Sequence, residues 1–311
     1  MATIFAGTAD GLHTFDPGGA PGPRALTGHD VWAVARQTWE HLWAIVDRRE
    51  IWRGDGEWRR VASVDDAPGA AGLQATCLAD TRANDLGGIL VGTTRARLLR
   101  IGAEGDVKPL SGFDDAPGRA EWHTPWGAPP DTRTITENGD AVFVNVHVGG
   151  VLRSRDQGAT WQPTIDIDAD VHGVVTGHGR VYAAGAAGLS VSEDGGDTWR
   201  LETAGLHAAY CRSVAVCGQS VLLSASEGPG GRRAAMYRSD AAAERFERCR
   251  EGLPESFGGN LDSLCVDALP GGELAAVATA AGEVYASADE GSTWTHLAAG
   301  LGTIHCILVL P

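Results

Sequence analysis

The segment Ser-Arg-Asp-Gln-Gly-Ala-Thr-Trp occupies residues 154–161, and two further segments repeat its pattern. Residues 192–199 read Ser-Glu-Asp-Gly-Gly-Asp-Thr-Trp, and residues 287–294 read Ser-Ala-Asp-Glu-Gly-Ser-Thr-Trp. Ser, Asp, Gly, Thr and Trp keep their places in all three segments, so the pattern is an internal repeat and not a chance similarity. We call these three segments the repeat turns.

The chemistry of the repeat turns indicates a structural role. Asp and Ser side chains hydrogen-bond nearby backbone amides in turns, and glycine adopts backbone angles that other residues resist. The Trp that ends each segment then returns into a strand and fills the space between sheets. We therefore expect the aspartates of the repeat turns, Asp156, Asp194 and Asp289, to hold the turn and to take no part in catalysis.

The sequence around each repeat turn predicts the four strands of one propeller blade. Three alternating strands precede the turn and a fourth follows the Trp. Three of the predicted fourth strands end in Gly-Leu, at 205–206, 252–253 and 300–301. Four short strands in roughly 44 residues match the size of a propeller blade. The predicted blades cover residues 31–64, 74–113, 132–164, 170–206, 211–253 and 261–301.

The two ends of the chain predict one more blade. Residues 303–310 form a first strand without successors, whereas residues 2–27 supply middle strands without a first. Joining them closes the fold and removes exposed strand edges. The prediction is an all-β fold, one seven-bladed β-propeller domain of four-stranded blades spanning residues 1–311, with six blades as the alternative count.

The repeat turns resemble the Asp-box, or BNR-repeat, motif of sialidase-like and related β-propellers. The resemblance implies that ligands bind over the propeller axis, on the face away from the turns. That face is built by the start of each first strand, where seven positions align in the predicted blades. They are Trp32, Ala75, Arg133, His172, Arg212, Asp262 and His305.

Most of these aligned positions carry polar or ionisable groups, which mark binding sites when they converge in a concavity. Neighbouring segments add His147, His207, Tyr210 and the Pro-rich, aromatic stretch that contains Trp126. The predicted ligand-binding residues are Arg133, His147, His172, His207, Tyr210, Arg212, Asp262, His305 and Trp126. The structural alternative is that Arg133 and Arg212 pair with Asp131, Asp170 or Asp262 and tie blades together.

Three histidines are the candidate metal ligands, His123, His147 and His172. Neutral imidazoles suit Zn, Cu, Fe or Ni, and three of them leave a coordination position open. The sequence contains no close-spaced His pair of the H-x-x-x-H kind, so the fold would have to assemble such a site. The arginines favour an anionic small molecule, a carboxylate or a phosphate, as the ligand.

The amino-acid composition limits the classes of partner that the protein is expected to bind. The chain carries 25 basic and 40 acidic residues, a formal net charge of −15, which repels the phosphate backbone of nucleic acids. The sequence shows no membrane-spanning run and no signal peptide. Six cysteines without a C-x-x-C pair are typical of buried free thiols. We expect a cytoplasmic protein that binds neither nucleic acid nor membrane.

Three functions remain open from the sequence. The first is binding or turnover of a small molecule at the His- and Arg-rich site, with or without a transition metal. The second is a non-catalytic scaffold that binds a protein partner. The third, which the Asp-box resemblance implies, is a sialidase-like glycoside hydrolase. That chemistry needs three arginines, a Tyr–Glu pair and an acid/base Asp, and only Arg133 and Arg212 stand in register.

Overall fold

The computed structural model describes residues 2–37, 41–80, 88–124, 126–147, 150–166, 168–258, 264–269 and 271–311. The chain divides into two compact units. One comprises Met1–Val31, Ala184–Val191 and Arg200–Pro311, and the other comprises Trp32–Ala183 and Ser192–Trp199. The expectation of a single domain stays a prediction. Among the described residues, no helix has the length and apolar character needed to cross a bilayer.

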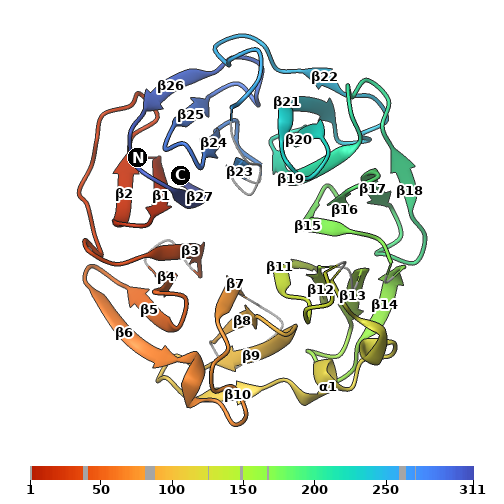
Figure 1. The fold of residues 1–311 in the computed structure, drawn as a ribbon. Coiled ribbons are helices and arrows are strands. Elements are labelled where there is room, and N and C mark those ends of the chain that lie inside the picture. The colour runs from red at the N-terminus through yellow and green to blue at the C-terminus, as the bar shows by residue number, and fades with distance from the viewer. Residues whose placement is uncertain are drawn as a thin grey trace. The chain divides into compact units, whose positions relative to one another are not determined.

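Strands follow one another along the chain in groups of four, and each group is one antiparallel sheet (Figure 1). The first group is β3 (Val31–Arg36), β4 (Leu42–Val46), β5 (Glu50–Gly54) and β6 (Trp58–Ser63). The second is β7 (Ala75–Asp80), β8 (Ile89–Thr93), β9 (Arg97–Ile101) and β10 (Val107–Pro109). The third is β11 (Thr132–Asn138), β12 (Ala141–Val146), β13 (Gly150–Ser154) and β14 (Gln162–Ile165).

Three more four-stranded sheets follow. The fourth is β15 (Val171–Gly177), β16 (Arg180–Gly185), β17 (Gly188–Ser192) and β18 (Arg200–Glu202). The fifth is β19 (Tyr210–Cys217), β20 (Ser220–Glu227), β21 (Arg232–Asp240) and β22 (Glu247–Arg248). The sixth is β23 (Leu264–Ala268), β24 (Ala275–Thr279), β25 (Val284–Ser287) and β26 (Thr295–Ala298). In the described part of the chain, the helical segments are the 3-10 turns Val64–Asp66 and Arg119–Glu121 and the single turn α1 (Ser111–Asp114).

The seventh sheet joins the two ends of the chain. Strand β1 (Thr3–Thr8) lies between β2 (Gly11–Phe15) and β27 (Ile304–Leu310) (Figure 1). This pairing of the first and last strands was predicted and is confirmed. The fourth strand expected for this sheet is reduced to two isolated bridges, Leu12↔Ala25 and Phe15↔Pro21. Seven antiparallel sheets with this order along the chain are the fold class of a seven-bladed β-propeller.

The repeat turns have one hydrogen-bond pattern. In the first, Gly158 N–H donates to Ser154 Oγ at 2.8 Å, and Thr160 N–H donates to Asp156 Oδ1 at 2.8 Å. The Asp194 and Asp289 turns make the equivalent bonds. The central glycine is left-handed in each, with φ near +87° in Gly158 and Gly196 and +83° in Gly291. The Ser and Asp side chains of each turn therefore hydrogen-bond to backbone groups of the same turn, as the sequence predicted.

Two of the tryptophans that end the turns, Trp161 and Trp294, are buried among apolar residues, whereas Trp199 is half-buried. Trp161 is 1% exposed and meets Phe113 edge-to-face, with ring centroids 5.1 Å apart. Its neighbours include Leu98 of one sheet and Val144 of the next, so the indole fills the space between them. Trp294 is buried in the same way between β20–β21 and β24–β25, beside Leu222 and Met236.

The Gly-Leu pairs end the blades in two different packing environments. Gly252 has φ +81°, and a Cβ built on it would lie 1.7 Å from the carbonyl oxygen of Trp294. Gly300 has φ +74°, but nothing lies within 4 Å of its Cβ position. Gly252 is therefore fixed by close backbone approach as well as by its left-handed conformation, as is Gly205, whose Cβ would lie 2.0 Å from the carbonyl oxygen of Phe246.

Candidate functional site

The candidate site begins where β12 ends. Strand β12 is buried through Val146, and His147 follows it directly with 7% of its surface exposed. Thr132 of β11 pairs with Val146, and the His147 backbone N–H donates to the carbonyl of Asp131 at 3.0 Å. Because the strands are antiparallel, the start of β11 and the end of β12 meet at one edge of the sheet. Arg133 and His147 thus lie together.

The other half of the site begins β15. Asp170 precedes the strand and His172 is its second residue, with a side chain that is 0% exposed. Residues two apart in extended chain point to the same side, so Asp170 and His172 lie side by side. Asn145 Nδ2 of β12 donates to the Val171 carbonyl at 2.9 Å and fixes the start of β15 beside β12.

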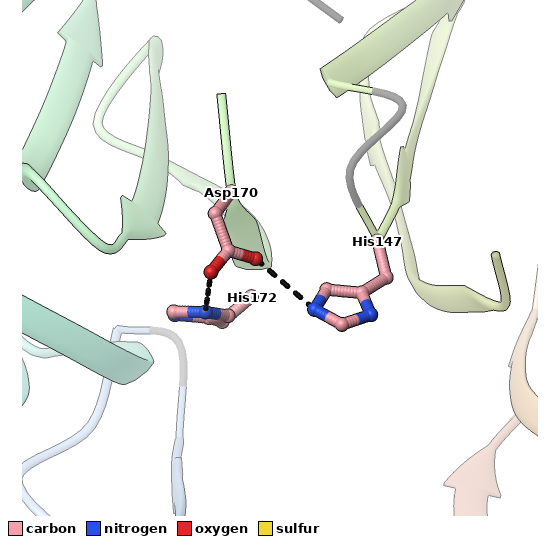
Figure 2. A group of neighbouring side chains, drawn as sticks. All are labelled: His147, Asp170 and His172. Atoms are coloured by element: carbon pink, nitrogen blue, oxygen red, sulfur yellow. Dashed lines mark ion pairs between the residues drawn. The ribbon is translucent and has the colours of Figure 1, made fainter. Parts of the chain in front are cut away.

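Two imidazoles converge on one carboxylate (Figure 2). His147 Nε2 lies 3.1 Å from Asp170 Oδ1, and His172 Nε2 lies 3.3 Å from Asp170 Oδ2. Each oxygen of the carboxylate therefore faces a different ring nitrogen. The two imidazole centroids are 6.3 Å apart. We call these three side chains the His–Asp–His group.

The surroundings of the group shift the pKa values of two carboxyl groups, Asp170 and Asp131, in opposite directions. The facing imidazoles of His147 and His172 hold the pKa of Asp170 far below its usual value, so Asp170 is ionised at neutral pH. Burial raises the pKa of Asp131, and the positive charges of Arg133 and Arg48 oppose that rise. The site thus combines a carboxylate that is ionised at neutral pH with a second carboxyl on which the charges of two arginines act.

The His–Asp–His group is a set of three side chains that could hold a metal ion. One ligand atom from each residue can be chosen so that all lie within 4.8 Å of one another. Zinc–nitrogen and zinc–oxygen bonds are about 2.0–2.2 Å, so a modest closing of the side chains would bring all three into contact with one ion. Asp170 Oδ1 is buried, and its 3.1 Å contact with His147 Nε2 is not an aligned hydrogen bond. A bound ion could therefore take the place of that contact. Two His and one carboxylate leave coordination positions open.

Two predicted residues border the group. Arg133 Nη2 lies 3.3 Å from Nδ1 of His147, on the side of the ring away from Asp170. Trp126 places its ring centroid 5.4 Å from that of His147, and 68% of its surface is exposed. The structure therefore brings together four of the predicted residues: Arg133, His147, His172 and Trp126.

His123, the third predicted metal ligand, is not in the group. Its side chain is exposed, and Nδ1 lies 2.8 Å from the carbonyl of Glu121 in its own loop. Asp170 stands where a third histidine was expected. Sequence reasoning considered Asp170 only as a partner for arginine. The signal that could have found it is the spacing Asp-x-His at the start of a strand, which places both side chains on one side.

Four of the remaining predicted residues, which are described, belong to the other compact unit and have contacts of their own: His207, Tyr210, Arg212 and His305. His207 stacks on Tyr237, and its Nδ1 lies 2.7 Å from the tyrosine hydroxyl. Burial, together with nearby Arg248 and Arg233, lowers the pKa of His207. The Arg212 guanidinium lies 5.9 Å from the ring centroid of Tyr210.

His305 makes a further His–carboxylate contact, separate from the His–Asp–His group. Its Nε2 lies 3.0 Å from Asp30 Oδ1 within the same unit. Among the described residues this contact is not part of a three-ligand group of the His–Asp–His kind. Asp262 lies outside the described residues, and its predicted role stays a prediction.

Comparisons with known proteins support the fold of this chain. No family model and no curated protein matches the sequence. Among solved structures, YCF48 bound to D1 peptide has a TM-score of 0.60 at 13% identity, covering 86% of this chain and 80% of that chain. The GH74 enzyme of Niastella koreensis has a TM-score of 0.60 at 17% identity, over 94% of this chain and 46% of that chain.

A third similar structure is the extracellular domain of a one component system, BT4673, from B. thetaiotaomicron. It has a TM-score of 0.62 at 11% identity, covering 97% of this chain and 37% of that chain. At these identities the likeness is one of fold, because propellers host many unrelated activities. The resemblance to the Asp-box family stays a prediction.

Proposed function

We propose that this protein binds a divalent transition-metal ion through His147, Asp170 and His172, and that the ion and Arg133 together bind a small anionic molecule. The observation that carries the proposal is the convergence of two Nε2 atoms on the two oxygens of one ionised carboxylate, at 3.1 and 3.3 Å. Imidazole and carboxylate are ligands that Zn²⁺, Fe²⁺, Co²⁺ and Ni²⁺ accept.

The anionic ligand follows from charge. A divalent ion on the group would add two positive charges next to Arg133, and an open coordination position accepts a carboxylate or phosphate oxygen. A guanidinium pairs with such groups through two parallel hydrogen bonds. The indole of Trp126, beside His147 and largely exposed, offers an apolar surface to the rest of the ligand.

The test is zinc titration by calorimetry on tag-free protein that has been treated with a chelator. We expect near-stoichiometric binding in the wild type and loss of binding in the His147→Ala, His172→Ala double variant. His123→Ala is the matched control, because it removes an exposed histidine outside the group. Circular dichroism must show that all three proteins are folded. Equal binding in the wild type and the double variant would overturn the proposal.

A protein partner is the second candidate. YCF48 is a propeller whose structure holds a peptide, and an exposed Trp is a residue type that protein interfaces favour. Trp126 would then contact the partner, and Trp126→Ala should abolish capture of that partner while leaving zinc affinity within about twofold of the wild type. Glycoside hydrolysis is less well supported, because both oxygens of Asp170 already face imidazoles and the likeness to the GH74 enzyme is one of fold.

A further inference from the structure

The contact between Arg133 and His147 determines where the imidazole carries its proton. A guanidinium has five N–H donors, no acceptor, and stays protonated in proteins. Arg133 Nη2 lies 3.3 Å from His147 Nδ1, so that nitrogen must present its lone pair. A neutral His147 then carries its proton on Nε2, which faces Asp170 Oδ1 at 3.1 Å. The described arrangement therefore favours the Nε2–H form of His147.

A metal ion requires the opposite form. To bind an ion through Nε2, the imidazole must offer its lone pair there and carry the proton on Nδ1. That N–H would point at the guanidinium of Arg133, where two donors face each other with no acceptor between them. The present position of Arg133 and a metal ion on Nε2 of His147 are thus incompatible.

We propose that Arg133 and the metal ion compete for His147, so that metal binding displaces the Arg133 guanidinium from Nδ1 of His147 and an oxyanion binds the displaced guanidinium. This inference rests on the proposed metal function and adds the order and coupling of its two ligands. The positive charges of Arg133 and Arg48 both act on Asp131. One carboxyl does not neutralise two guanidinium groups, so an oxyanion of the carboxylate or sulfate kind is the partner that charge favours.

Competition and release make the two ligands cooperative. An oxyanion that holds Arg133 away from His147 raises metal affinity, and metal raises oxyanion affinity by the same factor. Without an oxyanion, Arg133 lowers metal affinity by occupying Nδ1. Arg133 is thus a positioning residue that acts through His147.

The first test is ¹⁵N NMR of the imidazole nitrogens, whose chemical shifts distinguish the two neutral forms. The His147 signals are assigned by their loss in His147→Gln. We expect the Nε2–H form in metal-free wild type and the Nδ1–H form after addition of Zn²⁺. Finding the Nδ1–H form in metal-free protein would overturn the proposal.

The second test is zinc calorimetry with sulfate or chloride at equal ionic strength. Coupling of the usual size predicts that Arg133→Met binds zinc about 5- to 10-fold more tightly than wild type in chloride, and that sulfate strengthens zinc binding about 5-fold in wild type alone. Arg48→Met is the matched control for loss of one positive charge near Asp131, and we expect a change below about twofold.

The outcomes separate the two proposals. Zinc bound at the group with equal affinity in wild type and Arg133→Met would overturn the competition alone. Equal tightening in Arg48→Met and Arg133→Met would also overturn it, because general charge would then explain the effect. No zinc binding in any variant would overturn the proposed metal function and with it the competition.

Discussion

Asp194 of a repeat turn and Asp170 of the His–Asp–His group both have a pKa well below the ordinary value of an aspartate. The groups that lower it differ. Around Asp194 they are the hydroxyl and backbone N–H of Thr198 and the hydroxyl of Ser192, all from the same turn. Around Asp170 they are two imidazoles from two different sheets.

The difference shows which aspartates can bind something else. Short hydrogen bonds from within the same turn occupy the Asp194 carboxylate and fix the turn's backbone. A ligand that replaced these bonds would therefore destabilise the turn. The imidazoles can exchange their contact with Asp170 for a shared metal ion, because each needs only to give up a proton. A lowered pKa therefore does not identify a site until its causes are named.

The largest effect should come from changing the central ligand. Asp170→Asn keeps the shape of the side chain but removes its charge and one acceptor oxygen, so zinc affinity should fall about 1000-fold, or about 4 kcal/mol. Asp194→Asn is the control, and it should bind zinc as the wild type does. Zinc calorimetry measures both. If Asp194→Asn lost as much zinc affinity as Asp170→Asn, the proposed difference between the two aspartates would be wrong.

The next largest effect should come from a substitution that disrupts packing next to a repeat turn and so lowers the stability of the protein. Gly252→Ala places a Cβ 1.7 Å from the Trp294 carbonyl and also strains a left-handed residue. We expect a loss of about 3 kcal/mol or more in the free energy of unfolding, from overpacking and backbone strain together.

The control for that change is Gly300→Ala, which has the same Gly-Leu context and a similar φ of +74° but open space at its Cβ. Strain alone should cost it about 1–2 kcal/mol. Urea denaturation compares the two variants. Equal losses would show that close approach to Trp294 contributes nothing.

A smaller effect is expected inside a repeat turn. Asp289→Ala removes the acceptor of the Thr293 backbone N–H and hydroxyl, at 2.8 and 2.7 Å, and of the Ser287 hydroxyl. The expected loss is about 1–2 kcal/mol in the free energy of unfolding, because these bonds lie near the surface. Zinc affinity should not change. A loss of zinc binding in folded Asp289→Ala would show that a repeat turn supports the site.

The smallest effect depends on pH. The hydroxyl and backbone N–H of Thr160 lower the pKa of Asp156, so ionised Asp156 stabilises the folded state above the unfolded value of about 4. That stabilisation is lost as the pH falls through the lower folded pKa. Thr160→Val removes the hydroxyl and should lower stability by below about 1 kcal/mol at pH 7, with the gap shrinking below pH 4. Urea midpoints from pH 7 to pH 2 test this, and a gap that widens in acid would contradict it.

The repeat made the fold predictable from the sequence. Three copies of one turn set the blade length, and alternation along the strands placed the remaining blades. The first and last strands could be paired because each lacked partners. The weak fourth strand beside β2 could not be foreseen, since isolated bridges at Ala25 and Pro21 stand in place of a continuous strand.

The site was less predictable. Register of the first strands singled out Arg133 and His172, and the end of β12 singled out His147. Asp170 was missed as a ligand because it precedes its strand, where a carboxylate reads as an ordinary turn residue. His123 was preferred because histidine is the commonest ligand, yet its loop directs it to the Glu121 carbonyl. Contacts between distant segments are set by packing, which strand alternation alone does not encode.

The most direct test of the metal proposal is a crystal structure of the protein with Co²⁺, with diffraction measured on both sides of the cobalt absorption edge. The account predicts one strong anomalous peak about 2.0–2.2 Å from Nε2 of His147, Nε2 of His172 and an oxygen of Asp170. It also predicts that Arg133 has moved away from Nδ1 of His147. No peak at saturating cobalt, or a peak bound by other residues while Asp170 still faces both imidazoles, would contradict it.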